Sequence, residues 1–539
     1  MTAIGVNREF GSDVAGLGGS RAALPDLSEI AAAHLSDETR LVGGLIERAA
    51  MSSAEQKRID QLARRLVESA RSRKSASKGI EAFLQEYGLS SEEGVLLMCV
   101  AESLLRIPDH ATADKLIAEK LGEGAWEKHL GHSGSLLVNA STWGLMLTGR
   151  VVRLKADESN APLRALKRLV AGSGEPVIRS AVRQAVQILA NQFVLGQTIE
   201  KALARAKSFE KQGYLFSYDM LGEAAKTEAD AEAYFHRYLG AIEAVGAAAG
   251  PLDNPHPQYF MQRPGVSIKL SALHPRFEAG KEDRLAVELV PRLMQLLKAA
   301  KSAQIPVTID TEEQERLEPT LRVFGACFLD AELANWNGMG IAVQAYGKRA
   351  IPVLRWLRQL AHRGERIIPV RLVKGAYWDS EIKWAQQRGW DDYPVFTRKL
   401  HTDVSYLACA RLLLSDPSVF YAQFATHNAH SLASAYTFAG NTPAEFQRLH
   451  GMGETLYDDV LYDDSLKARC RIYAPVGGHE DLLAYLVRRL LENGANTSFV
   501  HRLGDASTPL EDIVANPVLR AEAERQDPEA AAVRIPRSE

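Results

Sequence analysis

The sequence predicts an α/β protein, a (β/α)8 barrel preceded by a mainly helical region. From residue 213 onward, short runs of apolar and β-branched residues alternate with amphipathic stretches of helical period. Eight such runs occur, which is the number of strands in this type of barrel. The main alternative is a doubly wound sheet, but the glycine fingerprint usual for that fold does not follow the first run, Tyr214–Tyr218.

The part of the chain before the barrel has helical patterns and no motif that carries chemistry. Residues 1 to about 35 are rich in Gly, Ala and Ser, so we interpret them as a weakly structured lead-in. Helical patterns follow from about Glu38 to Ala76 and, in shorter stretches, as far as Phe209. We expect an N-terminal arm over residues 1–60 and a helical domain with linker helices over 61–210.

The barrel is expected to span residues 211–500. Its predicted strands are Tyr214–Tyr218, Val266–Leu270, Val307–Asp310, Ile341–Gln344, Ile367–Val373, Phe420–Thr426, Phe446–Gly451 and Cys470–Ala474. Helical stretches follow most of them: Asp230–Ala248, Arg284–Ala303, Pro319–Leu329, Arg349–Arg363, Thr397–Leu414 and Asp481–Glu492. Residues 501–539 are interpreted as a loop-rich tail or linker with a short helix near Leu510–Ala515.

Composition argues against several classes of protein. Hydrophobic residues make up 46% and charged residues 24%, which is ordinary for a globular protein. The net charge of −3 gives no overall basic field for nucleic acid. The four cysteines are far apart, which favours reduced thiols in a cytosol over disulfides or structural zinc. No signal peptide and no apolar run of membrane-spanning length occurs, so we expect membrane contact to be peripheral.

Polar residues stand at the ends of six predicted strands, where barrels of this type place their active sites. Taken singly, each has a structural explanation: Asp310 could cap a helix, His427 could be a satisfied core histidine, and Lys269 could merely pair with Asp310. Together they predict an active site. No three-ligand metal set stands out, so no metal is expected. The residues are Lys269, Asp310, Gln344, Arg371, Lys374, Thr426, His427 and Tyr473.

The last predicted helix places two guanidiniums and a phenol on one face. Tyr485, Arg488, Arg489 and Glu492 are spaced i, i+3, i+4 and i+7, while leucines fill the other side. Paired guanidiniums suit a small carboxylate, because each offers a planar fork of donors. The alternative interpretation is a solvated face that carries an Arg–Glu pair.

A second cationic segment suits the phosphates of an organic cofactor. Lys374 and Gly375 follow a strand, and Thr397 and Arg398 open the next helix, where backbone N–H groups and positive charge favour anions. Trp378 and Phe499 could stack on the rings of such a cofactor.

Several long motifs make the similarity to a known family specific. Val-Ser-Ile-Lys-Leu-Ser-Ala-Leu (266–273), Arg-Leu-Val-Lys-Gly-Ala-Tyr-Trp (371–378), Phe-Ala-Thr-His-Asn (424–428) and Tyr-Leu-Val-Arg-Arg-Leu-Leu-Glu-Asn (485–493) occur in order. They resemble the proline dehydrogenase domain of the bifunctional proline utilisation A flavoproteins. Asn-Ala-Ser-Thr-Trp-Gly (139–144) resembles part of that family's helical region, so the resemblance covers nearly the whole chain.

This resemblance implies non-covalent FAD on a distorted (β/α)8 barrel and oxidation of L-proline to 1-pyrroline-5-carboxylate. It also implies that electrons pass to ubiquinone or a related membrane quinone. The protein would then be cytoplasmic, with peripheral association to the inner face of the cell membrane.

The resemblance also implies roles for individual residues. Arg488, Arg489 and Lys269 would hold the proline carboxylate, and Glu223 would pair with Arg488 as a lid. Asp310 would lie at the pocket floor, and the catalytic group would be Lys269, Asp310, Tyr473, Arg488 and Arg489. The walls around the proline ring would be Ala376, Leu449, Tyr473 and Tyr485. The FAD contacts would be Asp310, Gln344, Arg371, Val373, Lys374, Gly375, Ala376, Trp378, Thr397, Arg398, Thr426, His427, Glu492 and Phe499.

Two departures from the family pattern shape the expectations. The N-terminus does not resemble the ribbon-helix-helix segment of some members, so no nucleic-acid partner is expected. The family's NAD-dependent aldehyde dehydrogenase would begin after about residue 539, so we expect that module to be missing here. The product would then be released rather than channelled.

Two other functions stay open. The first is a Schiff-base aldolase or lyase on the same barrel with Lys269 as the nucleophile. The second is a catalytically idle scaffold that docks partners.

Overall fold

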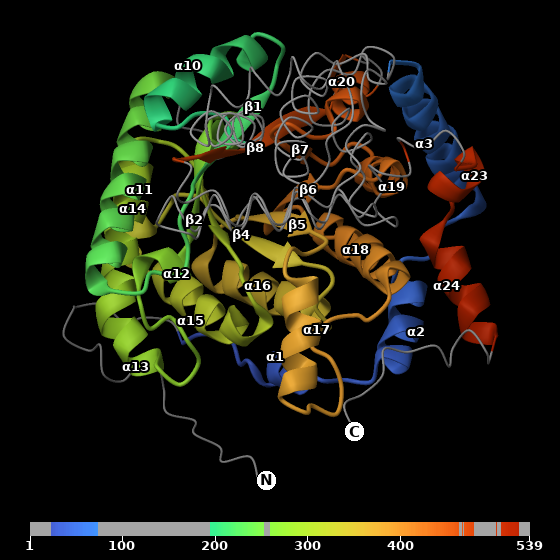
Figure 1. The fold of residues 1–539 in the computed structure, drawn as a ribbon, viewed down its shortest axis with the longest axis horizontal. Helices are drawn as coiled ribbons and strands as arrows, with labels where there is room; N and C mark the ends of the chain where they lie inside the picture. Colours follow the sequence, from blue (N-terminus) through green and yellow to red (C-terminus); the bar gives the residue numbers. More distant parts are fainter. Residues whose placement is uncertain are drawn as a thin grey trace, which may run out of the picture.

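The core of the protein is a closed barrel of parallel strands in sequential order, with β1 beside β8 (Figure 1). A computed structural model describes residues 23–73, 194–252, 259–462, 466, 468–478, 503 and 508–527. Each predicted strand overlaps an observed one, which confirms the barrel. The strands are β1 Leu215–Met220, β2 Gly265–Lys269, β3 Val307–Asp310, β4 Met339–Gln344, β5 Ile368–Val373, β6 Phe420–Ala425, β7 Ala444–Leu449 and β8 Arg469–Val476.

Alternate residues of a strand point to opposite faces, and β2 shows what this does in the barrel. Val266 and Ile268 are fully buried in the hydrophobic core. Ser267 lies between them in sequence and accepts a hydrogen bond from Arg371 of β5. Since β2 and β5 are not neighbours in the barrel, that bond crosses the interior. The interior therefore holds polar groups, which is what a site at its end requires.

Helices surround the barrel and return the chain from the carboxyl end of each strand to the start of the next (Figure 1). The connection after β5 has two helices, and the connection after β2 has three. The surrounding helices are α10 Ile199–Glu210, α11 Glu228–Ala249, α12 Leu270–Leu273, α13 Glu282–Arg284, α14 Val290–Ser302, α15 Leu317–Phe328, α16 Ala350–Gly364, α17 Trp378–Gln387, α18 Lys399–Leu414, α19 Ala429–Ala439 and α20 Glu454–Tyr462. The predicted helix Asp481–Glu492 lies outside the described residues.

Short single-turn elements complete the connections. They are the 3-10 helices η3 Tyr259–Gln262, η5 Gln314–Arg316 and η6 Ala331–Leu333, and the π-helical segment η4 Leu285–Leu289. The segment η5 matters for the site, because it follows the end of β3.

The N-terminal arm packs along the barrel rather than apart from it. Its helices are α1 Ser28–Ala32, α2 Glu38–Arg48 and α3 Ser53–Arg73. Helix α2 packs on α18, and α3 packs on α19 and α20 (Figure 1). The prediction of a weakly structured lead-in to residue 35 is wrong for α1, where Ile30 is buried. One short turn has too little apolar periodicity to be detected in a sequence.

The predicted loop-rich tail also differs from the structure. After α23, Leu510–Ile513, a second helix α24, Pro517–Gln526, packs against α2 and α18. Asn516 caps it by accepting the N–H of Val518 at 2.9 Å, and Pro517 occupies its first turn. We missed this helix because only a few of its residues face the barrel. The cap and the proline were the available signals.

Candidate active site

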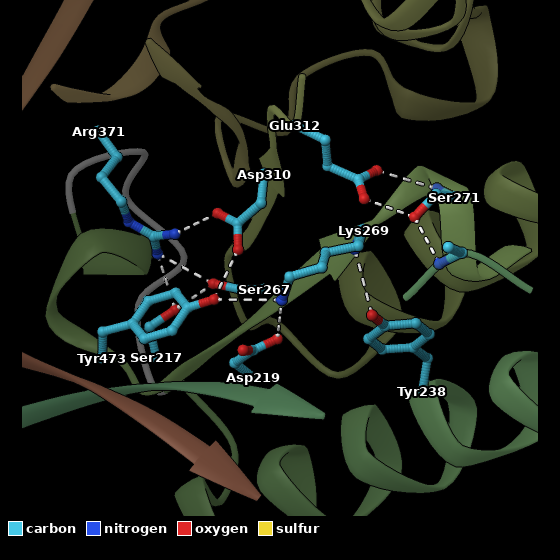
Figure 2. Close-up of polar contacts among 11 residues, drawn as sticks. Ser217, Asp219, Tyr238, Ser267, Lys269, Ser271, Asp310, Glu312, Arg371 and Tyr473 are labelled. Atoms are coloured by element: carbon cyan, nitrogen blue, oxygen red, sulfur yellow. Dashed lines mark hydrogen bonds and ion pairs between the residues drawn. The ribbon is translucent and has the colours of Figure 1, made fainter. Parts of the chain in front are cut away.

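Side chains from five strands form a hydrogen-bonded network at the carboxyl end of the barrel (Figure 2). Lys269 Nζ of β2 donates to Asp219 Oδ1 of β1 at 2.7 Å and lies 3.4 Å from the Tyr473 hydroxyl of β8. Tyr473 donates to Asp310 Oδ2 of β3 at 2.8 Å. Asp310 Oδ1 in turn accepts from Arg371 of β5 at 2.6 Å. The barrel thus brings together four predicted site residues and Asp219.

The network is largely buried and pairs opposite charges. Two carboxylates, Asp219 and Asp310, face two cations, Lys269 and Arg371. Burial opposes the charge on Lys269, but the two carboxylates outweigh it and raise the pKa of Lys269. Burial raises the pKa of Asp219 despite the neighbouring ammonium. Burial also raises the pKa of Tyr473 well above its usual value. The ammonium and the phenol therefore both keep their protons at neutral pH.

Arg371 anchors this network to the barrel interior. Its guanidinium donates to Gln447 of β7 at 2.8 Å and to the hydroxyls of Ser217 and Ser267, each at 3.0 Å. It also lies over the ring of Tyr473, 5.0 Å from the ring centroid. This fork of donors holds Asp310 and Tyr473 in fixed positions.

The segment after β5 holds further predicted cofactor contacts. Val373 is the last residue of β5, and Lys374 donates to Asp403 at 2.5 Å. Gly375 has φ 137°, and a Cβ there would lie 2.4 Å from the ring of Tyr346, so only glycine fits. Ala376 is half-buried, and its N–H lies 3.4 Å from Gln344 Oε1.

Trp378 offers an aromatic face next to this segment. It is 37% exposed and is the one aromatic side chain among the large exposed hydrophobic groups of the described residues. Its indole N–H donates to the carbonyl of Phe396 at 2.8 Å, which fixes the plane of the ring. A fixed, exposed ring suits stacking on a planar ligand.

Thr397 and Arg398, just before α18, contact other parts of the chain. Glu38 of the arm accepts the Thr397 N–H at 3.1 Å and the Thr397 hydroxyl at 2.9 Å. Arg398 pairs with Glu524 of α24 at 2.9 Å. The Thr397 N–H and hydroxyl therefore have a partner within the chain, a residue of the arm that sequence could not reveal. The role of Thr397 and Arg398 as cofactor contacts stays a prediction.

Two further predicted residues follow β6, beside the ends of β7 and β8. His427 Nε2 accepts the N–H of Leu449 at 3.1 Å, and Leu449 is paired in register with Tyr473. The Thr426 hydroxyl accepts the N–H of Asn428 at 3.1 Å. Leu449 and His427 are thus placed beside the network.

Some predicted site residues cannot be placed. Tyr485, Arg488, Arg489, Glu492 and Phe499 lie outside the described residues. Glu223 is described, half-buried in the loop between β1 and α11. Its predicted partner, Arg488, lies outside the described residues.

Sequence reasoning missed Asp219 and Glu38. Asp219 lies near the end of β1 and is the one charged residue of that strand, and a charge inside a predicted buried strand was an available signal. Glu38 carried no such signal, because its partner is 359 residues away in the sequence.

The described part of the chain offers neither a metal site nor a membrane-spanning helix. It contains no cluster of three or more His, Cys, Asp or Glu side chains suited to a metal ion. No helix found there combines the length and the hydropathy needed to cross a membrane.

Family models match three consecutive parts of the chain. The model described as "Proline dehydrogenase" matches residues 202–502 of 539, which include the barrel and its polar network. The model "DNA-binding domain of Proline dehydrogenase" matches residues 79–193, outside the described residues. The model "Proline utilization A proline dehydrogenase N-terminal domain" matches residues 28–71, the arm.

Curated relatives agree with these matches. The "Bifunctional protein PutA" of Salmonella typhimurium is 50% identical over 94% of this chain and 39% of its own length. The "Bifunctional protein PutA" of Escherichia coli is 50% identical over 92% of this chain and 38% of its own length. "Proline dehydrogenase 1" of Bacillus subtilis is 29% identical over 58% of this chain and 89% of its own. This chain therefore spans about two fifths of the bifunctional relatives.

Solved structures agree as well. A crystal structure of Bradyrhizobium japonicum proline utilization A has a TM-score of 0.70 at 44% identity, covering 94% of this chain and 50% of that one. The resemblance predicted from the motifs is confirmed. With a family match over residues 202–502 and relatives of one-half identity along nearly its whole length, this chain belongs to the proline dehydrogenase family.

Proposed function

We propose that this chain oxidises L-proline to 1-pyrroline-5-carboxylate, the first step of proline catabolism, with FAD as its cofactor and a membrane quinone such as ubiquinone as the final acceptor. The observation that carries the proposal is the buried Asp219–Lys269–Tyr473–Asp310–Arg371 network at the carboxyl end of the barrel, inside the segment that matches the family model.

The described residues fit a flavin. Trp378 presents a fixed, exposed ring, and Arg371 within β5 and Lys374 just after it supply positive charge. We propose that these residues, with Gln344, Gly375, Ala376, Thr397, Arg398, Thr426 and His427, hold the cofactor. Outside the described residues, Glu492 and Phe499 complete the predicted set. When bound, FAD supplies the hydride acceptor.

The protein residues bind and orient proline and exclude water. The Lys269 ammonium, held protonated by its carboxylate neighbours, offers a positive charge to the substrate carboxylate together with Arg488 and Arg489. Ala376, Leu449, Tyr473 and Tyr485 would wall the ring. Glu223 would close the pocket from the β1–α11 loop. A dry pocket favours the neutral form of the substrate amine, which hydride loss requires.

The state of Lys269 weighs against the Schiff-base alternative. A lysine nucleophile must lose its proton, and sites that use one lower the lysine pKa by desolvation or a second cation. Here buried carboxylates raise the pKa of Lys269 instead. Lys269 therefore suits charge recognition of a carboxylate better than covalent attack.

The test is a visible spectrum of the purified protein, recorded before and after L-proline is added without oxygen. Flavin bands that bleach on addition are the expected result. A colourless protein that also fails to take up added FAD would overturn the proposal. Borohydride trapping of a substrate adduct on Lys269 would then test the aldolase alternative, and its absence would leave the idle scaffold.

Membrane contact and localisation are part of the same proposal. A cytoplasmic protein that donates to a membrane quinone must reach the inner face of the membrane peripherally. Sedimentation with quinone-containing vesicles in the reduced and oxidised states tests this. The expected lack of a nucleic-acid partner stays a prediction, which an electrophoretic mobility shift assay would check.

A further inference from the structure

The loop between β1 and α11 contains a strained residue next to Glu223. Ala224 has φ 50°, in the left-handed region that residues with a Cβ seldom adopt. Such conformations persist only where surrounding contacts hold them, and they gather at functional sites. The contacts that hold Ala224 therefore also fix the position of Glu223.

One buried residue supplies the contacts that hold this strain. The Ala224 N–H donates to the Ser271 hydroxyl at 2.9 Å, and the Ala225 N–H donates to the Ser271 carbonyl at 2.9 Å. Ser271 lies in α12, directly after the site strand β2, and is 1% exposed. The two amides that follow Glu223 are thus fixed by a single side chain and its own backbone.

Ser271 is in turn held by Glu312 (Figure 2). Its hydroxyl donates to Glu312 Oε1 at 2.5 Å, and its N–H donates to Oε2 at 3.1 Å. Because the hydroxyl proton points to Glu312, the lone pairs of the hydroxyl are free to accept the Ala224 N–H. Gln344 Nε2 fixes the Glu312 backbone by donating to its carbonyl at 2.7 Å.

The charges around Glu312 do not give it another role. Arg316 is its nearest cation, 3.5 Å away, and Glu313 and Glu223 are the acidic groups near it. The side chain is buried, and burial raises the pKa of Glu312 to about 7. A carboxyl kept in so unfavourable a place has Ser271 as its principal partner.

We propose that Glu312 is a positioning residue, which acts through Ser271 to hold Ala224 and so to set Glu223 over the substrate pocket. The inference rests on the proposed function, since it gives Glu223 its place at the pocket. Glu312 touches no reacting atom, so its loss should weaken substrate binding more than turnover.

The test compares Glu312→Ala, Glu312→Gln and Ser271→Ala with the control Glu381→Gln in the full chain with its cofactor. Glu381 is also buried, with its pKa raised to about 7, and accepts the N–H of Gln314 at 2.6 Å. It thus holds the same β3–α15 loop without contacting Ser271. Hydrogen exchange of residues 220–227 and the kinetics of proline oxidation are the two readouts.

We expect Glu312→Ala and Ser271→Ala to speed exchange of the Ala224 and Ala225 amides. The KM for proline should rise about three- to tenfold, as for one lost hydrogen bond, with kcat within about twofold. Glu312→Gln keeps one acceptor oxygen and should show a smaller effect. Glu381→Gln should change neither readout.

Unchanged exchange and KM in Glu312→Ala would overturn the proposal. Equal changes in Glu381→Gln would also overturn it, because they would indicate general loosening of the β3–α15 loop. Wild-type protein that does not oxidise proline would refute the proposed function instead. The exchange readout would still decide whether Glu312 holds the loop.

Discussion

At the scale of single residues, the most consequential feature is the ion pair of Lys269 and Asp219. The two side chains are 8% and 0% exposed, so neither charge is solvated. Removing one partner from such a pair leaves an unpaired buried charge, which is far more destabilising than the absence of both. The pair therefore makes the site intolerant of single changes on either side.

Lys269→Met tests this directly. We expect it to lower the free energy of unfolding by roughly 3–5 kcal/mol, because Asp219 loses its counter-ion. The loss of stability should be larger at pH 8 than at pH 6. Protonation of Asp219 removes the unpaired charge, and burial already raises the pKa of Asp219. Urea unfolding followed by circular dichroism measures both values.

Two further variants serve as controls for this prediction. Lys298→Met breaks an exposed pair with Glu332 and should change stability by no more than about 1 kcal/mol. Adding Asp219→Asn to Lys269→Met should restore part of the lost free energy of unfolding. A double variant as unstable as the single one would contradict the ion-pair explanation.

Glu381 predicts a pH dependence of stability. Burial raises its pKa from 4.5 to about 7 in the folded state. Between these values the folded protein keeps a proton that the unfolded chain has released. Stability therefore falls as pH rises through this window, by up to about 3 kcal/mol from this group.

Glu381→Gln cannot ionise and keeps the acceptor for the N–H of Gln314. Relative to wild type, its thermal midpoint should be higher at pH 8 and nearly equal at pH 5. Glu332→Gln, at an exposed position, should show no such difference between the two pH values. An equal decrease of the thermal midpoint at both pH values would show that the charge of Glu381 does not destabilise the folded state.

At the scale of elements, α18 is completed by another part of the chain. No side chain of its own caps it, and Glu38 of α2 binds the Thr397 N–H and hydroxyl just before the helix and the His401 ring in its first turn. Burial opposes the charge of Glu38, but hydrogen bonds from His401 and Thr397 outweigh burial and lower its pKa. The stability it contributes is therefore present above pH 4.5 and is lost as pH falls through this lowered pKa.

Glu38→Ala should detach the arm from α18. Because the change removes the acceptor of the Thr397 N–H and hydroxyl, we expect a loss of roughly 1–3 kcal/mol in unfolding free energy and faster proteolysis within residues 33–52. Glu29→Ala breaks only an exposed contact with Arg355 and should cost within about 1 kcal/mol. Equal protease sensitivity of the two variants would argue against a special role for Glu38.

At the scale of the whole molecule, the sequence predicted the barrel because each strand has its own local signal. It also predicted Lys269, Asp310, Arg371 and Tyr473 as neighbours, since strand ends meet at one end of a barrel. It could not predict Asp219 as the partner of Lys269, because pairing depends on the relative register of two strands. The filled start of α18 and the packing of α24 depend on distant segments and gave no local pattern.

Arg371→Lys tests how much the hydrogen bonds of one side chain stabilise the barrel by linking its strands. The guanidinium joins β5 to groups of β1, β2, β3 and β7, whereas an ammonium cannot reach them together. We expect a loss of about 2–4 kcal/mol in unfolding free energy and a less cooperative thermal transition. Arg469→Lys, at an exposed position of β8, is the matched control. A change no larger than that of the control would contradict this role.

The bond between Glu38 and Thr397 also orders events during synthesis. The two residues are 359 positions apart, so at 5–20 residues per second the arm waits roughly 20–70 s on the ribosome for its partner. Until the barrel helices have been made, the apolar faces of α2 and α3 have no surface to pack against. Helices α2 and α3 are thus made well before the barrel segments that they contact, and during that interval their apolar faces are available to chaperones.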